Sequence, residues 1–136
     1  MKTAVDSSVL LDVFGGDADF GEASLDALRA AYDAGPLVAC DVVWAEVRAH
    51  FEDDTAFRRA VGVLGVRFEA LGDDAAAAAG RLWRLAPRPM NGVQRRLMAD
   101  FLIGAHAMSQ ADALLTRDRG FYRRYFDLNV IDPTGA

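Results

Sequence analysis

Four acidic residues occupy positions in the sequence where carboxylates are expected to gather. Asp6 ends the first apolar run, Glu46 lies beside the apolar stripe of a predicted helix, and Asp100 interrupts an apolar helical segment. Asp118 follows a later apolar run. Two unit charges ~4 Å apart at an effective dielectric of ~20 repel by about 4 kcal/mol, so such a cluster must protonate, unfold or bind cations. Oxygen ligands favour Mg²⁺ or Mn²⁺, and two such ions can promote phosphodiester cleavage.

Each acid also has an ordinary structural interpretation. Asp6 and Asp118 could cap the helices that follow them, and Glu46 could be a solvated helix residue. Asp100 is harder to explain in this way, because a buried acid needs partners or a metal. Asp41 is better explained as a helix cap. Three further acids are interpreted as surface or turn residues: Asp12, Asp112 and Asp132.

The elements that must position these acids alternate along the chain. Predicted strands cover 3–6, 37–40, 66–71, 113–116 and 129–132. Predicted helices cover 9–14, the segment between Asp17 and Gly35, and then 42–51, 56–64, 75–85, 98–109 and 121–126. This alternation is typical of βα units around a parallel sheet, where ligands bind at the carboxyl ends of the strands. The four acids are therefore expected to meet at one edge of the sheet.

Composition limits the possible classes of protein. The 136 residues fit one domain, and 52% hydrophobic with 26% charged residues is a globular composition. The net charge of −5 argues against a generic polyanion binder. A single cysteine, Cys40, excludes a disulfide scaffold. The acid at position 6 and the lack of a long apolar run predict a cytoplasmic protein that does not enter a membrane.

Three other sites that use strand-end acids or phosphate fit poorly. A receiver-like phosphoacceptor needs a lysine late in the chain, whereas the only lysine is Lys2. A haloacid-type phosphatase needs a second aspartate where this chain has Ser8. A nucleotide-binding module needs a glycine-rich turn after the first strand, which is absent from this sequence.

Four segments containing the acids resemble the signature segments of PIN domains, in particular those of VapC-type toxins from bacterial and archaeal toxin–antitoxin pairs. They are 3–11, 43–47, 99–107 and 115–121, and the likeness runs in order from residue 3 to residue 132. It implies a single PIN-like nuclease domain over 1–136, folded as a three-layer α/β/α sandwich with a central, mainly parallel sheet. It also implies an Mg²⁺- or Mn²⁺-dependent endoribonuclease, the toxin of a type II toxin–antitoxin system.

The resemblance assigns roles residue by residue. Asp6 and Asp100 would bind the metal directly, Asp118 directly or through water, and Glu46 would orient water. Ser7 and Thr116 match the polar residues that support the first and fourth acids. The segment 86–96 has no clear counterpart in the family pattern.

The resemblance also implies partners: a cognate VapB-like antitoxin, an RNA substrate and a second copy of the chain in a homodimer. Candidate RNA-binding arginines flank the acids: Arg95, Arg96, Arg117, Arg119 and Arg123. Tyr122 and Tyr125 could stack on unpaired bases. His50, His106 and Cys40 are interpreted as structural. The alternative function is a catalytically silent PIN-like scaffold that binds RNA or protein.

Overall fold

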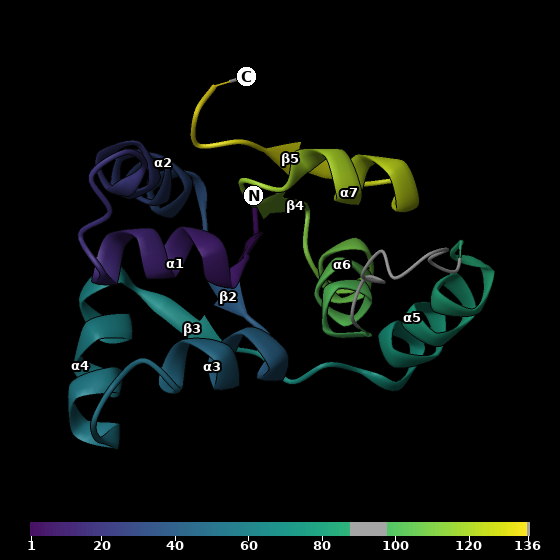
Figure 1. Ribbon diagram of the computed structural model, residues 1–136, viewed down its shortest axis with the longest axis horizontal. Helices are drawn as coiled ribbons and strands as arrows, with labels where there is room; N and C mark the ends of the chain where they lie inside the picture. Colours follow the sequence, from purple (N-terminus) through teal and green to yellow (C-terminus); the bar gives the residue numbers. More distant parts are fainter. Residues whose placement is uncertain (88–97, 136) are drawn as a thin grey trace, which may run out of the picture.

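The computed structural model describes residues 1–87 and 98–135. Its strands are β1 (Thr3–Val5), β2 (Leu37–Ala39), β3 (Val66–Phe68), β4 (Ala113–Leu115) and β5 (Asn129–Ile131). They form one sheet in the order β3-β2-β1-β4-β5 (Figure 1), and every neighbouring pair is parallel. The predicted parallel sheet is confirmed, and the carboxyl ends of its strands share one edge.

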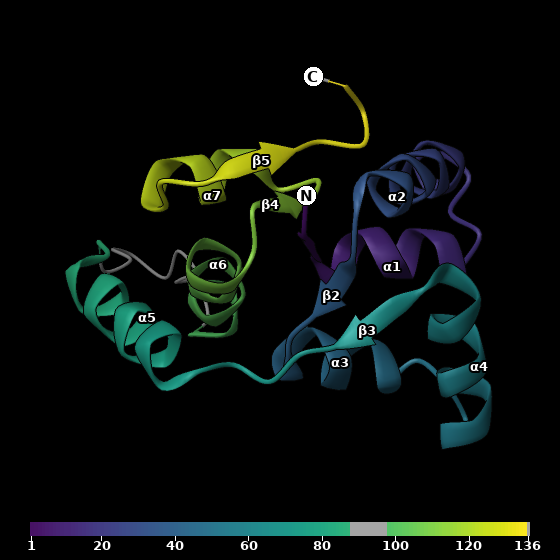
Figure 2. The same ribbon diagram turned by 180° about the vertical axis from the view of Figure 1, so that it is seen from behind.

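Seven helices surround this sheet in the described part of the chain. They are α1 (Ser7–Phe14), α2 (Gly21–Ala34), α3 (Asp41–Arg48), α4 (Asp54–Leu64), α5 (Asp73–Leu85), α6 (Met98–Gln110) and α7 (Arg119–Tyr125). Figures 1 and 2 show α1–α4 on one side of the molecule and α5–α7 on the other. Parallel strands are joined by right-handed crossovers, and the direction of the crossovers reverses after β3, which separates the helices in this way. The expected α/β/α sandwich is confirmed.

The central strands are apolar because both of their faces are covered. Ala4 and Val5 of β1 and Leu114 and Leu115 of β4 are buried, as expected of strands buried between two helical layers. The edge strand β3 differs, since only Val66 is buried while the rest of the strand is exposed. The predicted strand over 66–71 is therefore longer than the observed one.

The Asp53 side chain explains where α4 begins, whereas the prediction that Asp41 caps α3 is wrong. Asp53 caps α4 by accepting a hydrogen bond from the Ala56 N–H at 2.8 Å. Asp41 was expected to cap its helix, but Cys40 occupies the N-cap position of α3 and Asp41 lies in the first turn. Its Oδ1 instead accepts a hydrogen bond from the Leu71 N–H at 2.8 Å. Because α3 begins at Asp41, one residue before the predicted start, the Asp41 carboxylate binds the segment that follows β3.

Helix α6 is buried along most of its length because it packs against α5, β1 and β4. Phe101, Ile103 and Ala105 are all buried. Gly104 allows a close contact on a further side, since a Cβ atom there would lie 2.3 Å from Cε2 of Phe126. This packing fixes the helix that begins with the segment containing Asp100.

In the described segments, helices with the length and apolar character needed to cross a membrane are absent.

Candidate active site

Asp6 leaves the carboxyl end of β1 with both carboxylate oxygens held. Oδ1 accepts a hydrogen bond from the Ser7 backbone N–H at 2.7 Å, which makes Asp6 the N-cap of α1. Oδ2 accepts a hydrogen bond from the Thr116 hydroxyl, also at 2.7 Å. Since Val5 is in register with Leu115, the next residues in each strand, Asp6 and Thr116, emerge side by side. Asp6 is only 7% exposed.

Ser7 connects the first carboxylate to the second. Its hydroxyl lies 3.1 Å from Oε1 of Glu46 and 3.4 Å from Oδ1 of Asp6. A serine hydroxyl has one proton to donate, so the shorter contact with Glu46 is the stronger hydrogen bond. Glu46 comes from α3 and lies beside the buried stripe of Val43 and Val47, at the border between the core and the exposed side of the helix.

The electrostatics show that three carboxylates influence one another. Burial raises the pKa of Asp6 to about 6, although the hydrogen bonds from Thr116 and Ser7 act in the opposite direction. The charges of Glu46 and Asp100 raise the pKa of Asp6 further. Removal from water also raises the pKa of Glu46, and Asp100 adds to that increase while the Ser7 hydroxyl opposes it. Asp6, Glu46 and Asp100 therefore occupy a common field of negative charge.

Asp118 is linked to this group through Thr116. The Thr116 hydroxyl that donates to Asp6 also accepts a hydrogen bond from the Asp118 backbone N–H at 3.0 Å. Asp118 occupies the N-cap position of α7, but its side chain makes no capping hydrogen bond within the described backbone of that helix. The capping interpretation does not account for this residue.

The donor set is suited to a hard cation, because Asp6 and Glu46 present carboxylate oxygens whose pKa values are raised by burial and by neighbouring carboxylate charge. Within residues 1–87 and 98–135, however, three His, Cys, Asp or Glu side chains do not come close enough together to bind one metal ion. The residues present fit a divalent cation by their chemistry.

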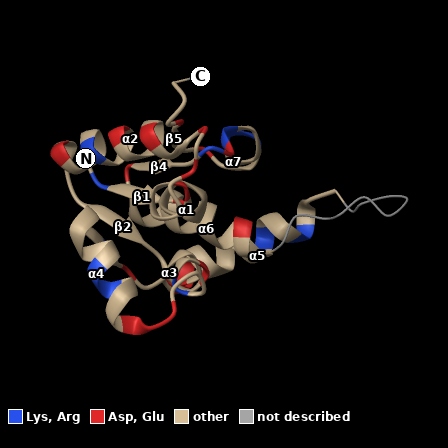
Figure 3. Cartoon of the chain, turned by 60° about the vertical axis from the view of Figure 1, so that its left-hand side comes forward, with Lys and Arg blue, Asp and Glu red and all other residues tan. Residues whose placement is uncertain are grey.

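The candidate RNA-binding arginines are largely engaged inside the protein. Arg117 forms two hydrogen bonds with the carboxylate of Asp12. Nε of Arg119 lies 3.6 Å from Oδ2 of Asp132. Nη2 of Arg123 donates a hydrogen bond to the Val130 carbonyl at 3.4 Å. Figure 3 shows the basic segments of α7 beside acidic ones. Arg95 and Arg96 lie outside the described residues.

Two interpretations based on sequence, those of Asp12 and Tyr122, are corrected here. Asp12 is not a surface acid, since it is only 5% exposed. The turn interpretation of Asp132 is confirmed, since its Oδ1 accepts hydrogen bonds from the Thr134 N–H and hydroxyl, and its side chain is largely covered beside Arg119. Tyr122 is buried and cannot stack on bases, whereas Tyr125 is partly exposed. The burial of Asp12 could have been predicted from the sequence, because Asp12 falls on the same helical face as Val9 and Val13.

The interpretation of Cys40 and His106 as structural residues is confirmed, but the contact between His106 and Glu69 was not predicted. Cys40 is buried in the core. His106 is also buried, and its Nε2 lies 3.0 Å from Oε1 of Glu69. Burial lowers the pKa of His106, while Glu69 acts in the opposite direction. Glu69 also pairs with Lys2, so this cluster connects α6 to the end of β3 and the start of β1. Sequence spacing gives no indication of that contact.

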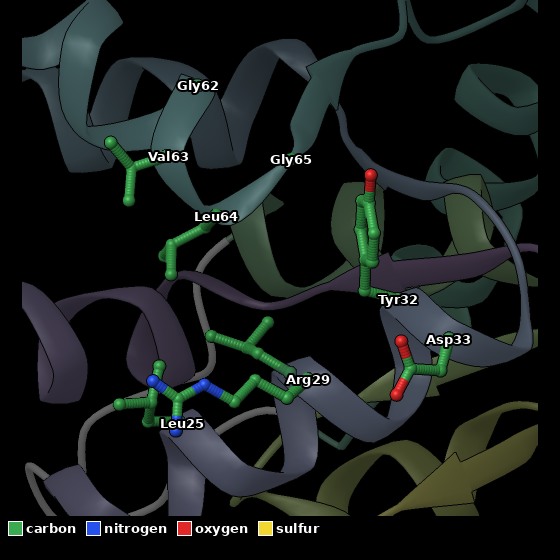
Figure 4. A pocket seen from close by; sticks show the side chains of 9 residues that line it. Leu25, Arg29, Tyr32, Asp33, Gly62, Val63, Leu64 and Gly65 are labelled. Carbon is green, nitrogen blue, oxygen red and sulfur yellow. The ribbon is translucent and has the colours of Figure 1, made fainter.

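A pocket of about 630 Å³ lies elsewhere. Figure 4 shows it between α2, which contributes Leu25, Arg29 and Tyr32, and the end of α4, which contributes Val63 and Leu64. These segments lead into β2 and β3, so the pocket opens near the amino-terminal edge of the sheet. The carboxylates lie at the opposite edge, and the pocket is not part of their site.

Comparisons with solved structures identify the same fold in toxin–antitoxin complexes. A chain of VapBC2 from Rickettsia felis, bound to a promoter DNA fragment, has a TM-score of 0.70 and 13% identity, covering 97% of this chain and 98% of that one. VapBC-1 from nontypeable Haemophilus influenzae gives 0.69 and 19%, covering 98% and 99%. VapC20 from Mycobacterium tuberculosis, described as a sarcin-ricin loop cleaving toxin, gives 0.59 and 14%, covering 91% and 95%.

Sequence comparison gives the family. No curated protein matches the sequence. The family description "PIN domain" matches residues 3–127, which include Asp6, Glu46, Asp100 and Asp118. The parallel sheet, the strand-end carboxylates and this match agree, and the chain belongs to the PIN domain family.

Proposed function

We propose that the protein is a metal-dependent endoribonuclease that acts as the VapC-type toxin of a type II toxin–antitoxin pair. The observation that supports this most directly is the burial of Asp6, which raises its pKa to about 6, beside the charges of Glu46 and Asp100, which raise it further. A buried carboxylate destabilised by two others is suited to binding a divalent cation. The fold shared with VapBC complexes supports the toxin assignment.

In this proposal Asp6 and Asp100 hold Mg²⁺ or Mn²⁺, and Asp118 contributes directly or through a water molecule. The bound cation supplies positive charge that offsets the charge developing on the phosphodiester. Glu46, held by the Ser7 hydroxyl at 3.1 Å, orients the attacking water. Thr116 keeps Asp6 in place through its hydrogen bond to Oδ2.

The proposed macromolecular partners are RNA, a VapB-like antitoxin and a second copy of the chain. Arg119, which follows Asp118, and the exposed Arg123 are candidates for phosphate contacts, because their contacts with Asp132 and the Val130 carbonyl are long, at 3.6 and 3.4 Å. We expect the antitoxin to cover the carboxylates, so co-purified antitoxin should suppress cleavage. The oligomeric state can be measured by light scattering on the isolated chain.

The test is cleavage of a mixed RNA pool by the purified protein with Mg²⁺, with Mn²⁺ and with EDTA. We expect cleavage with either metal and none with EDTA or with Asp6→Asn. Asp26→Asn is a matched control, because Asp26 is an exposed acid on α2. Cleavage by Asp6→Asn at the wild-type rate would contradict the assignment of the site.

The second candidate is a catalytically silent scaffold. Its support is that three potential metal-binding side chains do not meet within the described residues. A folded protein that binds Mn²⁺ or RNA without cleaving the pool would favour this function.

A further inference from the structure

The loop that joins β4 to α7 is attached at successive residues to different partners. Thr116 donates to Asp6 and accepts from the Asp118 N–H. The backbone N–H of Thr116 donates to the Ile131 carbonyl at 3.0 Å. Arg117, between Thr116 and Asp118, extends to Asp12 instead. Whether Arg117 can bind RNA depends on how firmly its guanidinium is held by Asp12.

The Arg117 guanidinium is held along one edge and on one face. Its Nε donates to Oδ2 of Asp12 at 2.6 Å, and its Nη2 donates to Oδ1 at 3.0 Å. Its Cζ lies 4.2 Å from the centre of the Phe20 ring. This two-pronged geometry with ring stacking is specific to arginine, because lysine has neither a planar fork nor a stacking face.

Asp12 is committed to the same contact. It is 5% exposed, and its other side-chain partner is the hydroxyl of the fully buried Ser24, at 2.9 Å. Release of Arg117 to bind a phosphate would leave a buried carboxylate without its counter-charge, which is strongly unfavourable. The pair therefore stays closed while the rest of the surface meets RNA.

The two attachments of the loop are on one helix. Asp6 caps the start of α1, and Asp12 lies six residues further on, roughly 9 Å along the helix axis. Without a second contact to α1, the chain after Thr116 could pivot about the hydrogen bond to Asp6, because the backbone hydrogen bonds at Leu115 and Thr116 hold the chain up to Thr116. The second attachment, from Arg117 to Asp12, prevents that rotation and fixes the direction in which Asp118 leaves the sheet.

We propose that Arg117 and Asp12 are positioning residues that hold Thr116 and Asp118 against Asp6, and that Arg117 does not contact the substrate. The effect on catalysis depends on the nuclease function proposed above. The effect on loop structure does not depend on it, so the two proposals can fail separately.

The test compares Arg117→Gln, Asp12→Asn and the double variant with Arg123→Gln as the control. We expect each single variant to lower kcat for RNA cleavage about tenfold or more, because small misplacements of catalytic groups are costly. KM and the salt dependence of RNA binding should stay at wild-type values. The double variant should be no slower than the slower single variant, as expected for two residues in one interaction. Arg123→Gln, on the exposed side of α7, should instead raise KM and reduce the salt slope by about one.

Hydrogen exchange at the backbone amides of Thr116 and Asp118 provides a readout without RNA. Both amides should exchange faster in Arg117→Gln and Asp12→Asn, and at the wild-type rate in Arg123→Gln. If Asp12→Asn does not fold, Arg117→Lys keeps the positive charge and loses the two-point hydrogen bonding and the stacking on Phe20, and it should show the same changes more weakly.

Two results would overturn the inference. One is a raised KM and a reduced salt slope in Arg117→Gln together with normal kcat in Asp12→Asn, which would place Arg117 on the RNA. The other is unchanged amide exchange in both variants. If the wild-type protein cleaves no RNA, the proposed function fails, and the exchange measurement still decides whether the pair positions the loop.

Discussion

Two fully buried threonines, Thr3 and Thr116, differ in the partners of their hydroxyl groups. The Thr3 hydroxyl has no hydrogen-bond partner among the described residues, whereas the Thr116 hydroxyl has Asp6 and the Asp118 N–H. We expect Thr3→Val to increase the free energy of unfolding by about 1 kcal/mol, because a buried unpaired polar group is removed. Thr116→Val should decrease it by about 1–3 kcal/mol, because two buried groups lose their partner. Denaturant titrations measure both changes, and destabilisation by Thr3→Val would mean that its hydroxyl is satisfied.

Asp6 should make the metal-free protein less stable as the pH rises. Its pKa is about 6 in the folded state against 3.8 ordinarily, so the folded state binds the proton more tightly than the unfolded state. The resulting stabilisation is complete below pH ~4 and is lost as the pH passes through ~6. Its size is of the order of 3 kcal/mol.

We therefore expect Asp6→Asn, measured with EDTA, to be more stable than the wild-type protein at pH 7 and similar to it near pH 4. The asparagine can retain the local contacts, with its oxygen accepting from Ser7 and its amide donating to the Thr116 hydroxyl. Thermal unfolding of both proteins and of Asp26→Asn across this pH range tests the expectation. A wild-type advantage at pH 7 would contradict it.

At the residue scale, the sequence was informative where a residue type and a strand end coincide. Asp6 and Thr116 follow apolar runs, and the structure joins their side chains. The Arg117–Asp12 pair was missed because its two residues are 105 positions apart and each resembles an ordinary surface charge. Burial of such a pair depends on how α1, α2 and the loop after β4 pack, which local spacing does not determine.

At the scale of the elements, α6 depends on a residue without a side chain. A Cβ at Gly104 would lie 2.3 Å from the Phe126 ring, so Gly104→Ala must move α6 or Phe126. We expect this substitution to cost about 1–3 kcal/mol of stability, as overpacked cores do. A displaced α6 would also move Asp100, so cleavage should fall with stability.

Gly62→Ala is the matched control for this substitution. Gly62 lies within α4, and a Cβ there would have no neighbour within 4 Å in the described structure. Alanine should increase stability by about 0.5–1 kcal/mol through helix propensity. Similar thermal shifts for the two variants would contradict the close α6–Phe126 contact.

The elements themselves were predicted well because their signals are local. Short apolar or β-branched runs predicted all five strands, and helical spacing, residue composition and the breakers between elements predicted all seven described helices. The predicted helix starts were less accurate, since those of α1, α3, α4, α5 and α7 fall one or two residues late. Asp41 and Asp73 lie inside the first turn rather than at the cap, because the preceding Cys40 and Gly72 adopt the extended cap conformation. Acidic residues favour both positions, so type alone does not separate them.

At the scale of the whole molecule, a bound cation should stabilise the fold. The proposed site relieves the repulsion among its carboxylates only when it binds positive charge, and a ligand at 100 times its Kd adds about 2.7 kcal/mol. We expect Mn²⁺ to raise the Tm of the wild-type protein and to weaken the pH dependence caused by Asp6. Asp6→Asn should show a much smaller Mn²⁺ shift, whereas an equal shift would place the cation elsewhere.

The order of the strands affects how the protein is made. β1 lies between β2 and β4, and the hydrogen bond from Thr116 to Asp6 spans 110 positions of the chain. During translation the first carboxylate therefore leaves the ribosome long before the strand that orients it, and such distant pairings form late in folding. For the proposed nuclease, a nascent chain stays inert while its own message is still being read. The arrival of β4, rather than the synthesis of Asp6, determines when the nuclease can first cut RNA.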